Sequence, residues 1–187
     1  MKKILSLILA ALMLFVVFTG CEKVEDKDNS SVASKPTVQL VELASKGKIP
    51  EMQFGIGAGV DEVKEYYNNQ IANDPQAAEV LEYTVDEYTK IDLGAFAYYY
   101  ETENKEGGIV GVTSVDKAFG FSMNLALLED VLAVAGENAV ETLATDSELF
   151  FIPGGAPEGA KKIYLTAGEY ELKLFFFNGY LTAVSLF

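Results

Sequence analysis

The stretch of sequence that decides the fold is KIYLTAGEYELKLFFFNGYLTAVSLF, at positions 162–187. Its apolar and β-branched runs predict strands at 162–167, 170–177 and 180–187. Asn178-Gly179 separates the last two runs. This pair is a strong hairpin signal, because a type I′ turn needs positive φ at both central residues. We therefore expect an antiparallel sheet built around this hairpin.

Side chains of the predicted hairpin alternate between two faces, because successive residues of a strand point in opposite directions. With Phe177 opposite Tyr180, one face is almost entirely apolar and is expected to pack under helices. That face comprises Leu172, Leu174, Phe176, Leu181, Ala183 and Ser185. The other face comprises Glu171, Lys173, Phe175, Phe177, Tyr180, Thr182, Val184 and Leu186.

The mixed face of the hairpin contains a candidate binding face, made of Glu171, Lys173, Phe175, Phe177 and Tyr180. Aromatic rings among charged side chains suit recognition of a protein, peptide or glycan, since each ring buries a large area at low entropy cost. The alternatives are that another loop or strand covers these rings, or that they are ordinary exposed apolar residues. A similar tyrosine cluster occurs at 98–100, where alternation allows at most part of the cluster to lie in the core.

The region before this hairpin alternates between helical and strand-like patterns. Apolar spacing predicts helices at 37–46, 60–70 and 125–135, and the Asp74-Pro75 pair predicts a short helix at 75–82. We expect the helix at 125–135 to be capped by Asn124 and well buried, because it is apolar nearly all round. Further strands are predicted at 83–88, 95–101, 108–116 and 148–152.

The order of helix then strands occurs twice. Residues 52–116 and 119–187 can be laid over each other, with Gly108–Ser114 matching Gly179–Ser185. The predicted fold class is therefore α+β, a single domain over 37–187 made of two tandem helix-then-antiparallel-strand repeats. The helices are expected to pack on one face of one antiparallel sheet.

The N-terminal region has the pattern of a bacterial export signal. Lys2 and Lys3 precede a run of 15 residues, 4–18, that is apolar apart from one serine, and this length suits a signal peptide better than a membrane span. The following Phe-Thr-Gly-Cys resembles a lipobox. We expect residues 1–20 to be a lipoprotein signal peptide, with cleavage between Gly20 and Cys21 and lipidation of the Cys21 thiol. The alternatives are an uncleaved anchor or a plain secretory signal.

Residues 21–36 are predicted to be a disordered tether, because their polar and charged composition cannot bury a core. The chain carries 28 acidic and 14 basic residues, for a net charge of −14. Removal of residues 1–20 takes away two lysines, and 12 minus 28 gives −16. The single cysteine fits an exported chain that uses its thiol for a lipid rather than for a disulfide.

Missing residue types exclude several classes of chemistry. Histidine is absent, which excludes an imidazole base and a histidine-ligated zinc site. The basic residues are all lysine, so there is no arginine clamp for phosphate, and the acidic balance disfavours nucleic acid. GIGAG at 55–59 lacks the lysine-serine/threonine tail of a P-loop and a properly spaced third glycine. We expect it to be a flexible segment that precedes a helix. We expect no cofactor, no metal and no catalytic set.

Acidic side chains give only weak support for a metal site or a catalytic site. Glu101, Glu103 and Glu106 lie close together in a predicted turn, but their spacing does not match an EF-hand, and a solvated acidic turn is favoured over a calcium site. Glu129 and Asp130 fit a favourable interaction with a helix dipole. A glycosidase would need two carboxylates about 5–10 Å apart across a cleft, and the sequence leaves that alternative open.

Two segments resemble a known family. LVELASKGKIPEMQFGIGAGVDEVKEYY (40–67) resembles the start, and the 162–187 stretch the closing hairpin, of the domain of unknown function 4309, found in lipoproteins of low-GC Gram-positive bacteria. The family is similar in layout to β-lactamase-inhibitor-like tandem repeats. Residues 66–90 depart from the family pattern by running longer. The resemblance implies a lipid-anchored protein on the outer face of the cytoplasmic membrane of a Gram-positive bacterium, and it implies no activity.

These features favour a non-enzymatic binding or assembly module, held on the membrane through Cys21, whose partner is a protein or a cell-wall glycan. The alternatives are a cell-envelope hydrolase and a protein inhibitor of an extracytoplasmic enzyme. A solute-binding lipoprotein is disfavoured, because about 150 residues is small for two lobes that close on a ligand.

Overall fold

The computed structural model describes residues 40–74, 79–136, 139–149, 151–152 and 159–187. All of them belong to one compact unit, Ala33–Phe187. The predicted signal peptide, the cleavage and lipidation residues Gly20 and Cys21, and the tether lie outside the described residues. Within the described ranges, no helix has both the length and the apolar character needed to cross a bilayer.

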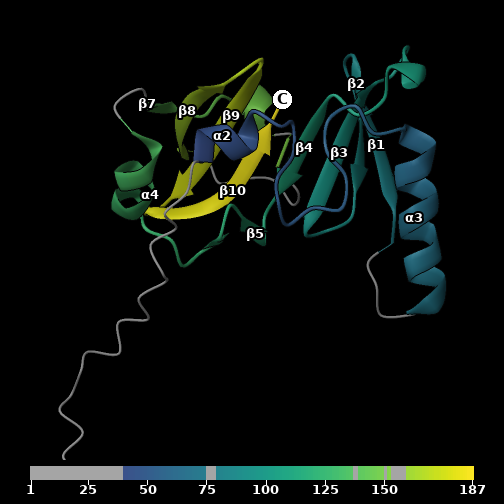
Figure 1. Cartoon of the computed structure of the whole chain (residues 1–187), viewed down its shortest axis with the longest axis horizontal. Coiled ribbons are helices and arrows are strands. Elements are labelled where there is room, and N and C mark those ends of the chain that lie inside the picture. The colour runs from purple at the N-terminus through teal and green to yellow at the C-terminus, as the bar shows by residue number, and fades with distance from the viewer. Residues whose placement is uncertain (1–39, 75–78, 137–138, 150, 153–158) are drawn as a thin grey trace, which may run out of the picture. The chain divides into compact units, whose positions relative to one another are not determined.

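The architecture is α+β, built on one antiparallel sheet of eight strands (Figure 1). The strand order is β1-β2-β3-β4-β10-β9-β8-β7. It therefore consists of two meanders, β1 to β4 and β7 to β10, joined by pairing of their last strands β4 and β10. The strands are β1 Leu81–Val85, β2 Tyr88–Asp92, β3 Phe96–Glu101, β4 Gly111–Ser114, β7 Val140–Leu143, β8 Lys161–Ala167, β9 Tyr170–Phe177 and β10 Tyr180–Leu186. A separate small hairpin pairs β5 Lys117–Ala118 with β6 Phe121–Ser122.

The predicted turn between β9 and β10 is confirmed. Asn178 and Gly179 have φ values of 51° and 84°, and Phe177 lies opposite Tyr180. A β-bulge then shifts the register between Leu181 and Ala183. Beyond the bulge, the predicted distribution of β10 side chains between the faces is wrong, because one extra residue reverses the alternation. Val184 and Leu186 therefore join the main core, while Ala183 and Ser185 lie on the opposite face.

Helices α2 (Leu40–Ala44), α3 (Val60–Asn73) and α4 (Leu128–Ala135) contribute to one apolar core with one face of the sheet, here called the main core face. The opposite side is called the second face. The short helix α5 (Asp146–Leu149) approaches that second face, since Glu148 contacts lysines of β8 and β9 there. The expectation that all helices pack on one face is therefore wrong for α5. A 3-10 turn, η1 (Lys105–Gly107), links β3 to β4.

The predictions of a helix at 75–82 and of one strand at 83–88 differ from the structure. Residues 81–82 were expected in a helix but begin β1. The single strand expected at 83–88 is interrupted: 83–85 belong to β1, 86–87 form the hairpin turn, and Tyr88 begins β2. Asp86 takes a φ of 52° in this turn. Aspartate tolerates the left-handed region, so the Asp-Glu pair at 86–87 supports a tight turn without a glycine.

The helix expected at 125–135 begins later, at Leu128, and is less buried than predicted. Asn124 is not its N-cap but has a φ of 62°, and its N–H donates to the Leu181 carbonyl at 2.6 Å. Residues 124–127 thus run alongside the start of β10 before the helix begins, and Leu125 is left 76% exposed. Only Val131 and Ala135 of α4 are fully buried.

The strand expected at 148–152 is also wrong, because α5 occupies its start. The Glu148 carboxylate accepts a hydrogen bond from the Thr145 N–H at 3.0 Å, and the Glu148 N–H donates to the Thr145 carbonyl at 3.0 Å. The first bond is one half of a capping box, the second is a main-chain turn bond, and Thr-x-x-Glu at 145–148 is the sequence signature of such a helix start. Helix initiation here overrides the apolar run that follows.

Candidate functional site

The predicted binding face on β9 and β10 is not one open surface. Phe175 is 0% exposed, Phe177 is half-buried and Tyr180 is 43% exposed. Glu171 is exposed and Lys173 is half-buried on the second face. Phe175 is buried and cannot contact a partner. The predicted binding face is therefore wrong as one continuous surface, because the covered ring of Phe175 separates Glu171 and Lys173 from Tyr180.

The cover over Phe175 comes from the segment around α5. Ile152 packs with Phe175 and Ala183 in a second apolar cluster, to which Val115 and Ala144 add partly buried side chains. Two main-chain carbonyls tie the segment to the sheet. The Tyr99 hydroxyl donates to the Phe151 carbonyl at 2.5 Å, and the Lys90 ammonium donates to the Ile152 carbonyl at 3.4 Å. Covering by a loop, the alternative left open by the sequence, is what occurs at Phe175.

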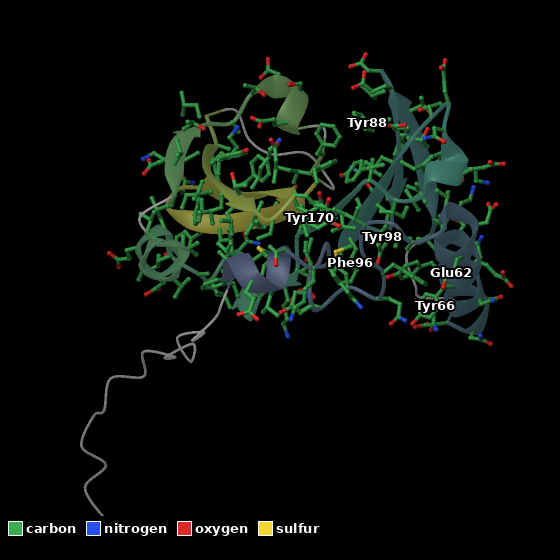
Figure 2. All side chains as sticks on the ribbon, turned by 45° about the horizontal axis from the view of Figure 1, so that its top comes forward. Glu62, Tyr66, Tyr88, Phe96, Tyr98 and Tyr170 are labelled. Carbon is green, nitrogen blue, oxygen red and sulfur yellow. The ribbon has the colours of Figure 1, made fainter. Side chains whose placement is uncertain are left out.

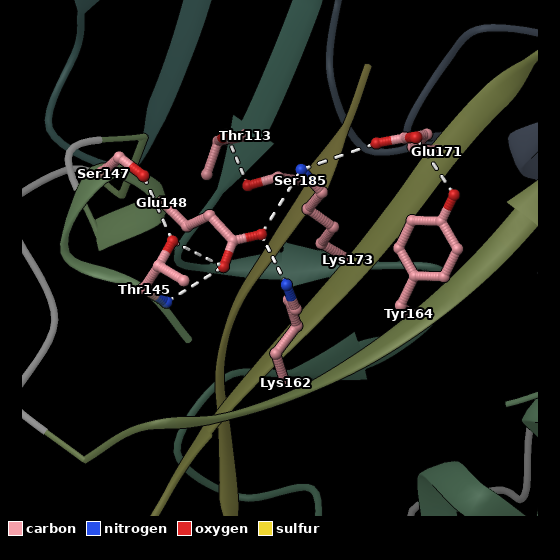
Figure 3. Close-up of polar contacts among 9 residues, drawn as sticks. All are labelled: Thr113, Thr145, Ser147, Glu148, Lys162, Tyr164, Glu171, Lys173 and Ser185. Carbon is pink, nitrogen blue, oxygen red and sulfur yellow. Dashed lines mark hydrogen bonds and ion pairs between the residues drawn. The ribbon is translucent and has the colours of Figure 1, made fainter. Parts of the chain in front are cut away.

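Glu148 is the centre of a polar network that fixes α5 on the second face (Figure 3). Its carboxylate lies 2.5 Å from the Lys162 ammonium and 3.5 Å from that of Lys173, and Lys173 also lies 3.6 Å from Glu171. Burial raises the pKa of Glu148, but hydrogen bonds from Lys162 and Thr145 outweigh burial and bring this pKa down to about 2. Glu148 therefore stays ionised and holds the segment in place.

A cavity of about 230 Å³ lies beside this network. Its apolar lining comes from Tyr88, Phe151, Phe175 and Phe187, and its polar lining from Glu148, Glu171, Lys173 and Ser185. The two carboxylates share Lys173 as a cationic partner. A general acid needs a raised pKa, whereas that of Glu148 is lowered, so the geometry here stabilises charge rather than supplies a proton.

All three tyrosines at 98–100 are buried, which corrects the expectation that at most part of this cluster is core. Tyr98 belongs to the main core face, and its hydroxyl lies 2.9 Å from that of Tyr67. Tyr99 belongs to the second face, where its ring packs 5.1 Å from Phe151 and 5.3 Å from Phe187. Burial raises the pKa of both phenols. Both faces of the sheet are covered at β3, so a tyrosine is buried whichever face its side chain points to.

A larger and more open recess lies on the other side of the sheet. It is a groove of about 570 Å³ between α3 and residues 48–53, with the β2–β3 turn as its floor. Half-buried rings of Tyr66 and Phe96 line it from α3 and from the start of β3, and Gln53 and Gln70 stand at its two sides. Figure 2 shows Tyr66, Phe96 and Tyr98 near one another in this region, set apart from Tyr88. We refer to this recess as the aromatic groove.

Internal hydrogen bonds hold the loop wall of the aromatic groove. The Lys48 ammonium donates to the Gln53 carbonyl at 3.0 Å. The Glu51 carboxylate accepts from the N–H groups of Phe119 and Gly120 at 2.8 and 2.7 Å. Buried Ile49 and Met52 anchor the same loop in the main core. This wall is therefore formed without help from a ligand.

Aromatic packing holds the opposite wall. Phe54 meets Tyr66 and Tyr67 edge-on, at ring-centroid distances of 5.3 and 6.3 Å, and Tyr67 is bonded to Tyr98. In contrast, no hydrogen bond to another described residue occupies the side-chain amide of Gln53 or Gln70, and both residues are exposed. The groove thus has walls held by internal contacts and, among the described residues, two exposed side-chain amides with no internal hydrogen bond.

Sequence reasoning missed this groove. The one local signal is Tyr66 and Gln70, which are four residues apart and so share one side of α3. Its other parts come from residues 48–53 and 93–96, and no local pattern links these segments. In the acidic turn at 101–106, the Glu101 carboxylate accepts from Asn104 at 3.2 Å, and Lys105 forms an ion pair with Asp61 of α3. Among the described residues, no group of three or more acidic or cysteine side chains is placed to hold a metal ion.

The comparison with solved structures relates this architecture to a known one. The crystal structure of a DUF4309 family protein, YjgB from Bacillus subtilis subsp. subtilis str. 168, superposes with a TM-score of 0.51. The match covers 84% of this chain and 98% of that chain at 15% sequence identity. The fold is similar to that of a DUF4309 family protein. At this identity the likeness concerns the fold alone. No family model and no curated protein matches the sequence.

Proposed function

We propose that this protein is an extracytoplasmic lipoprotein of the DUF4309 family, anchored in the cytoplasmic membrane of a Gram-positive bacterium through Cys21, and that it binds a ligand without transforming it. The lipobox-like Phe-Thr-Gly-Cys at 18–21 supports the anchor. The similarity of the fold to YjgB supports the family. The proposed ligand site is the aromatic groove.

The observation that carries the binding function is the state of the polar groups in the aromatic groove. Its charged side chains, Lys48 and Glu51, are engaged by main-chain groups, whereas the amides of Gln53 and Gln70 are uncommitted. Amides donate and accept hydrogen bonds but do not transfer protons near neutral pH. The groove is therefore suited to recognition rather than to acid–base catalysis.

A hydrolase is less well supported. The two carboxylates of the 230 Å³ cavity, Glu148 and Glu171, both lie within ion-pair distance of Lys173. Hydrolysis of a glycoside needs one carboxylic acid that stays protonated near neutral pH, and the lowered pKa of Glu148 opposes that role.

We also propose that the domain consists of two tandem repeats, corresponding to 52–116 and 119–187. Each proposed repeat contributes a helix followed by strands, α3 before β1–β4 and α4 before β7–β10. The last strands of the two, β4 and β10, pair with each other at the middle of the sheet. This arrangement is the one expected if two copies of a meander associate through equivalent edges.

The anchor is tested by comparing wild type with Cys21→Ala in a Gram-positive host. The wild-type chain is expected in the membrane fraction at mature size, with an acylated N-terminal peptide in mass spectrometry. Cys21→Ala is expected to accumulate as uncleaved precursor or to leave the membrane. A variant that remains membrane-bound at mature size would refute lipidation at Cys21.

The groove is tested in the same cells by site-specific photo-crosslinking of the full chain. A photoreactive residue at Gln53, on the rim, is expected to capture a ligand, whereas one at Asn68 is the matched control. Asn68 is exposed on α3 and lies about 200° around the helix from Gln70. Equal labelling at the two positions, or none at Gln53, would overturn the assignment of the groove as the ligand site.

A further inference from the structure

We infer that the ligand of the aromatic groove is a neutral glycan chain, whose sugar rings contact Tyr66 and Phe96 and whose hydroxyl groups hydrogen-bond to the amides of Gln53 and Gln70. This inference rests on the proposed function, because it names the class of ligand for that site.

The lining matches the two kinds of surface that a pyranose presents. A sugar ring has an apolar face of C–H groups, which packs against the half-buried rings of Tyr66 and Phe96. Its rim carries hydroxyls that both donate and accept, and a side-chain amide supplies an acceptor oxygen and two donor hydrogens. Gln53 and Gln70 lie on different walls, so a chain lying in the groove meets an amide on each side.

Charge favours a neutral ligand. The Lys48 ammonium is directed to the Gln53 carbonyl, and the Glu51 carboxylate is occupied by two N–H groups. The protein as a whole carries a net charge of −14, which repels polyanions such as phosphate-rich polymers. An anionic ligand would need a cation cluster, and the groove lining contains the single lysine Lys48.

The floor of the groove disfavours an extended peptide. Peptides that add a strand need a row of free main-chain N–H and C=O groups. In the β2–β3 turn these groups are used internally: Leu93 N–H donates to the Phe96 carbonyl at 2.9 Å, and Ala95 N–H donates to the Leu93 carbonyl at 3.0 Å. The Ala95 carbonyl in turn accepts from Val115 N–H at 2.9 Å. The floor of the groove therefore offers a ligand side chains rather than free main-chain groups.

Titration of the full chain in detergent micelles with neutral hexasaccharides, namely chito-, cello- and malto-oligosaccharides, tests the inference by calorimetry. Saturable binding of at least one hexasaccharide is expected. Gln53→Ala and Gln70→Ala should each weaken it about fivefold, the loss of one hydrogen bond. Phe96→Leu should weaken it by about five- to tenfold through loss of the ring. Asn68→Ala should leave the dissociation constant within about twofold, because Asn68 lies about 200° around α3 from Gln70 and does not line the groove.

The outcomes separate the ligand class from the proposed function. Binding that all three groove variants leave unchanged would place the sugar elsewhere and overturn the inference. No binding of any hexasaccharide would also overturn it, while crosslinking specific to Gln53 would still support the groove as a ligand site. Binding of wall stem peptides, weakened by Gln53→Ala, would replace the glycan by a peptide. Gln53 and Gln70 are exposed, so loss of folding does not explain their effects, and thermal unfolding of each variant verifies this.

Discussion

The two faces of the sheet are buried in different ways. The main core face is an almost wholly apolar layer, which runs from Ile91 and Tyr98 through Val112 to Leu172 and Ile163 beneath α2, α3 and α4. The second face buries polar side chains in pairs. Lys90 lies 2.9 Å from Asp92, and the Thr113 and Ser185 hydroxyls lie 2.8 Å apart.

This difference shows what each face requires of its cover. Apolar burial is non-directional, so the main core face needs area above it rather than particular partners. Buried polar groups need hydrogen bonds, and the short segment around α5 provides them to Lys90 and Tyr99. Among the described residues, no buried side-chain nitrogen or oxygen lacks a partner. Burial of the second face therefore depends more strongly on the exact positions of a few residues than burial of the main core face does.

The largest expected effect comes from adjacent residues that point to opposite faces. Leu174→Ala should cost about 2–5 kcal/mol and Phe175→Ala about 3–5 kcal/mol of unfolding free energy, because both side chains are fully buried. Denaturant unfolding followed by circular dichroism measures both. Tyr180→Ser is the control and should cost less than about 1 kcal/mol, since Tyr180 is 43% exposed. A cost below about 1 kcal/mol for Phe175→Ala would mean that the second face is open after all.

A smaller loss of unfolding free energy is expected at Gly111, where the Phe187 ring lies across the second face. A Cβ atom at Gly111 would lie 2.2 Å from a ring carbon of Phe187, and Gly111 does not have positive φ. Gly111→Ala should therefore cost about 1–3 kcal/mol through overpacking. In a Phe187→Ala background the same substitution should become nearly neutral, and a double-mutant cycle measures this coupling. Equal costs in the two backgrounds would show that the ring does not rest on Gly111.

The fold was predictable where local signals and burial agree. Asn178-Gly179 set the β9–β10 turn correctly, and Val60 and Val63 marked the buried side of α3. The faces of β10 were wrong beyond Leu181, because a bulge leaves no clear trace in an alternating apolar run. The strand expected at 148–152 was wrong because the Thr-x-x-Glu signature of a helix start at 145–148 was not recognised.

The candidate site was harder to predict than the fold. Glu171 and Lys173 do line a cavity, but what closes it is Phe151 and Phe187, which the sequence did not connect to them. The aromatic groove brings together α3, the 48–53 loop and the β2–β3 turn, and contacts between distant segments leave no periodic pattern. The presence of an aromatic residue alone does not distinguish burial in the core from a place in a groove wall, as Phe175 and Tyr66 show.

The smallest expected effect concerns the ionic link between α5 and the second face. Glu148→Gln should cost about 1–2 kcal/mol at pH 7, because hydrogen bonds to a charged group are lost while the shape is kept. The matched control is Glu141→Gln, which removes a 2.7 Å ion pair with Lys161 at the surface and should cost less than about 0.5 kcal/mol. Denaturant unfolding at pH 7 measures both costs.

The pH dependence of the Glu148→Gln difference distinguishes an ionic link from simple packing. The folded-state pKa of Glu148, about 2, is below its usual value of 4.5, so its ionised form stabilises the fold above that usual value. The stabilisation is lost as the pH falls from about 5 through 2, where the wild-type carboxyl becomes protonated and resembles glutamine. Wild type should therefore lose stability faster than Glu148→Gln over this range, and the two should converge near pH 2. A difference that stays constant from pH 7 to pH 2 would show that Glu148 acts by packing, and the second face would then differ less from the main core face than its ion pairs indicate.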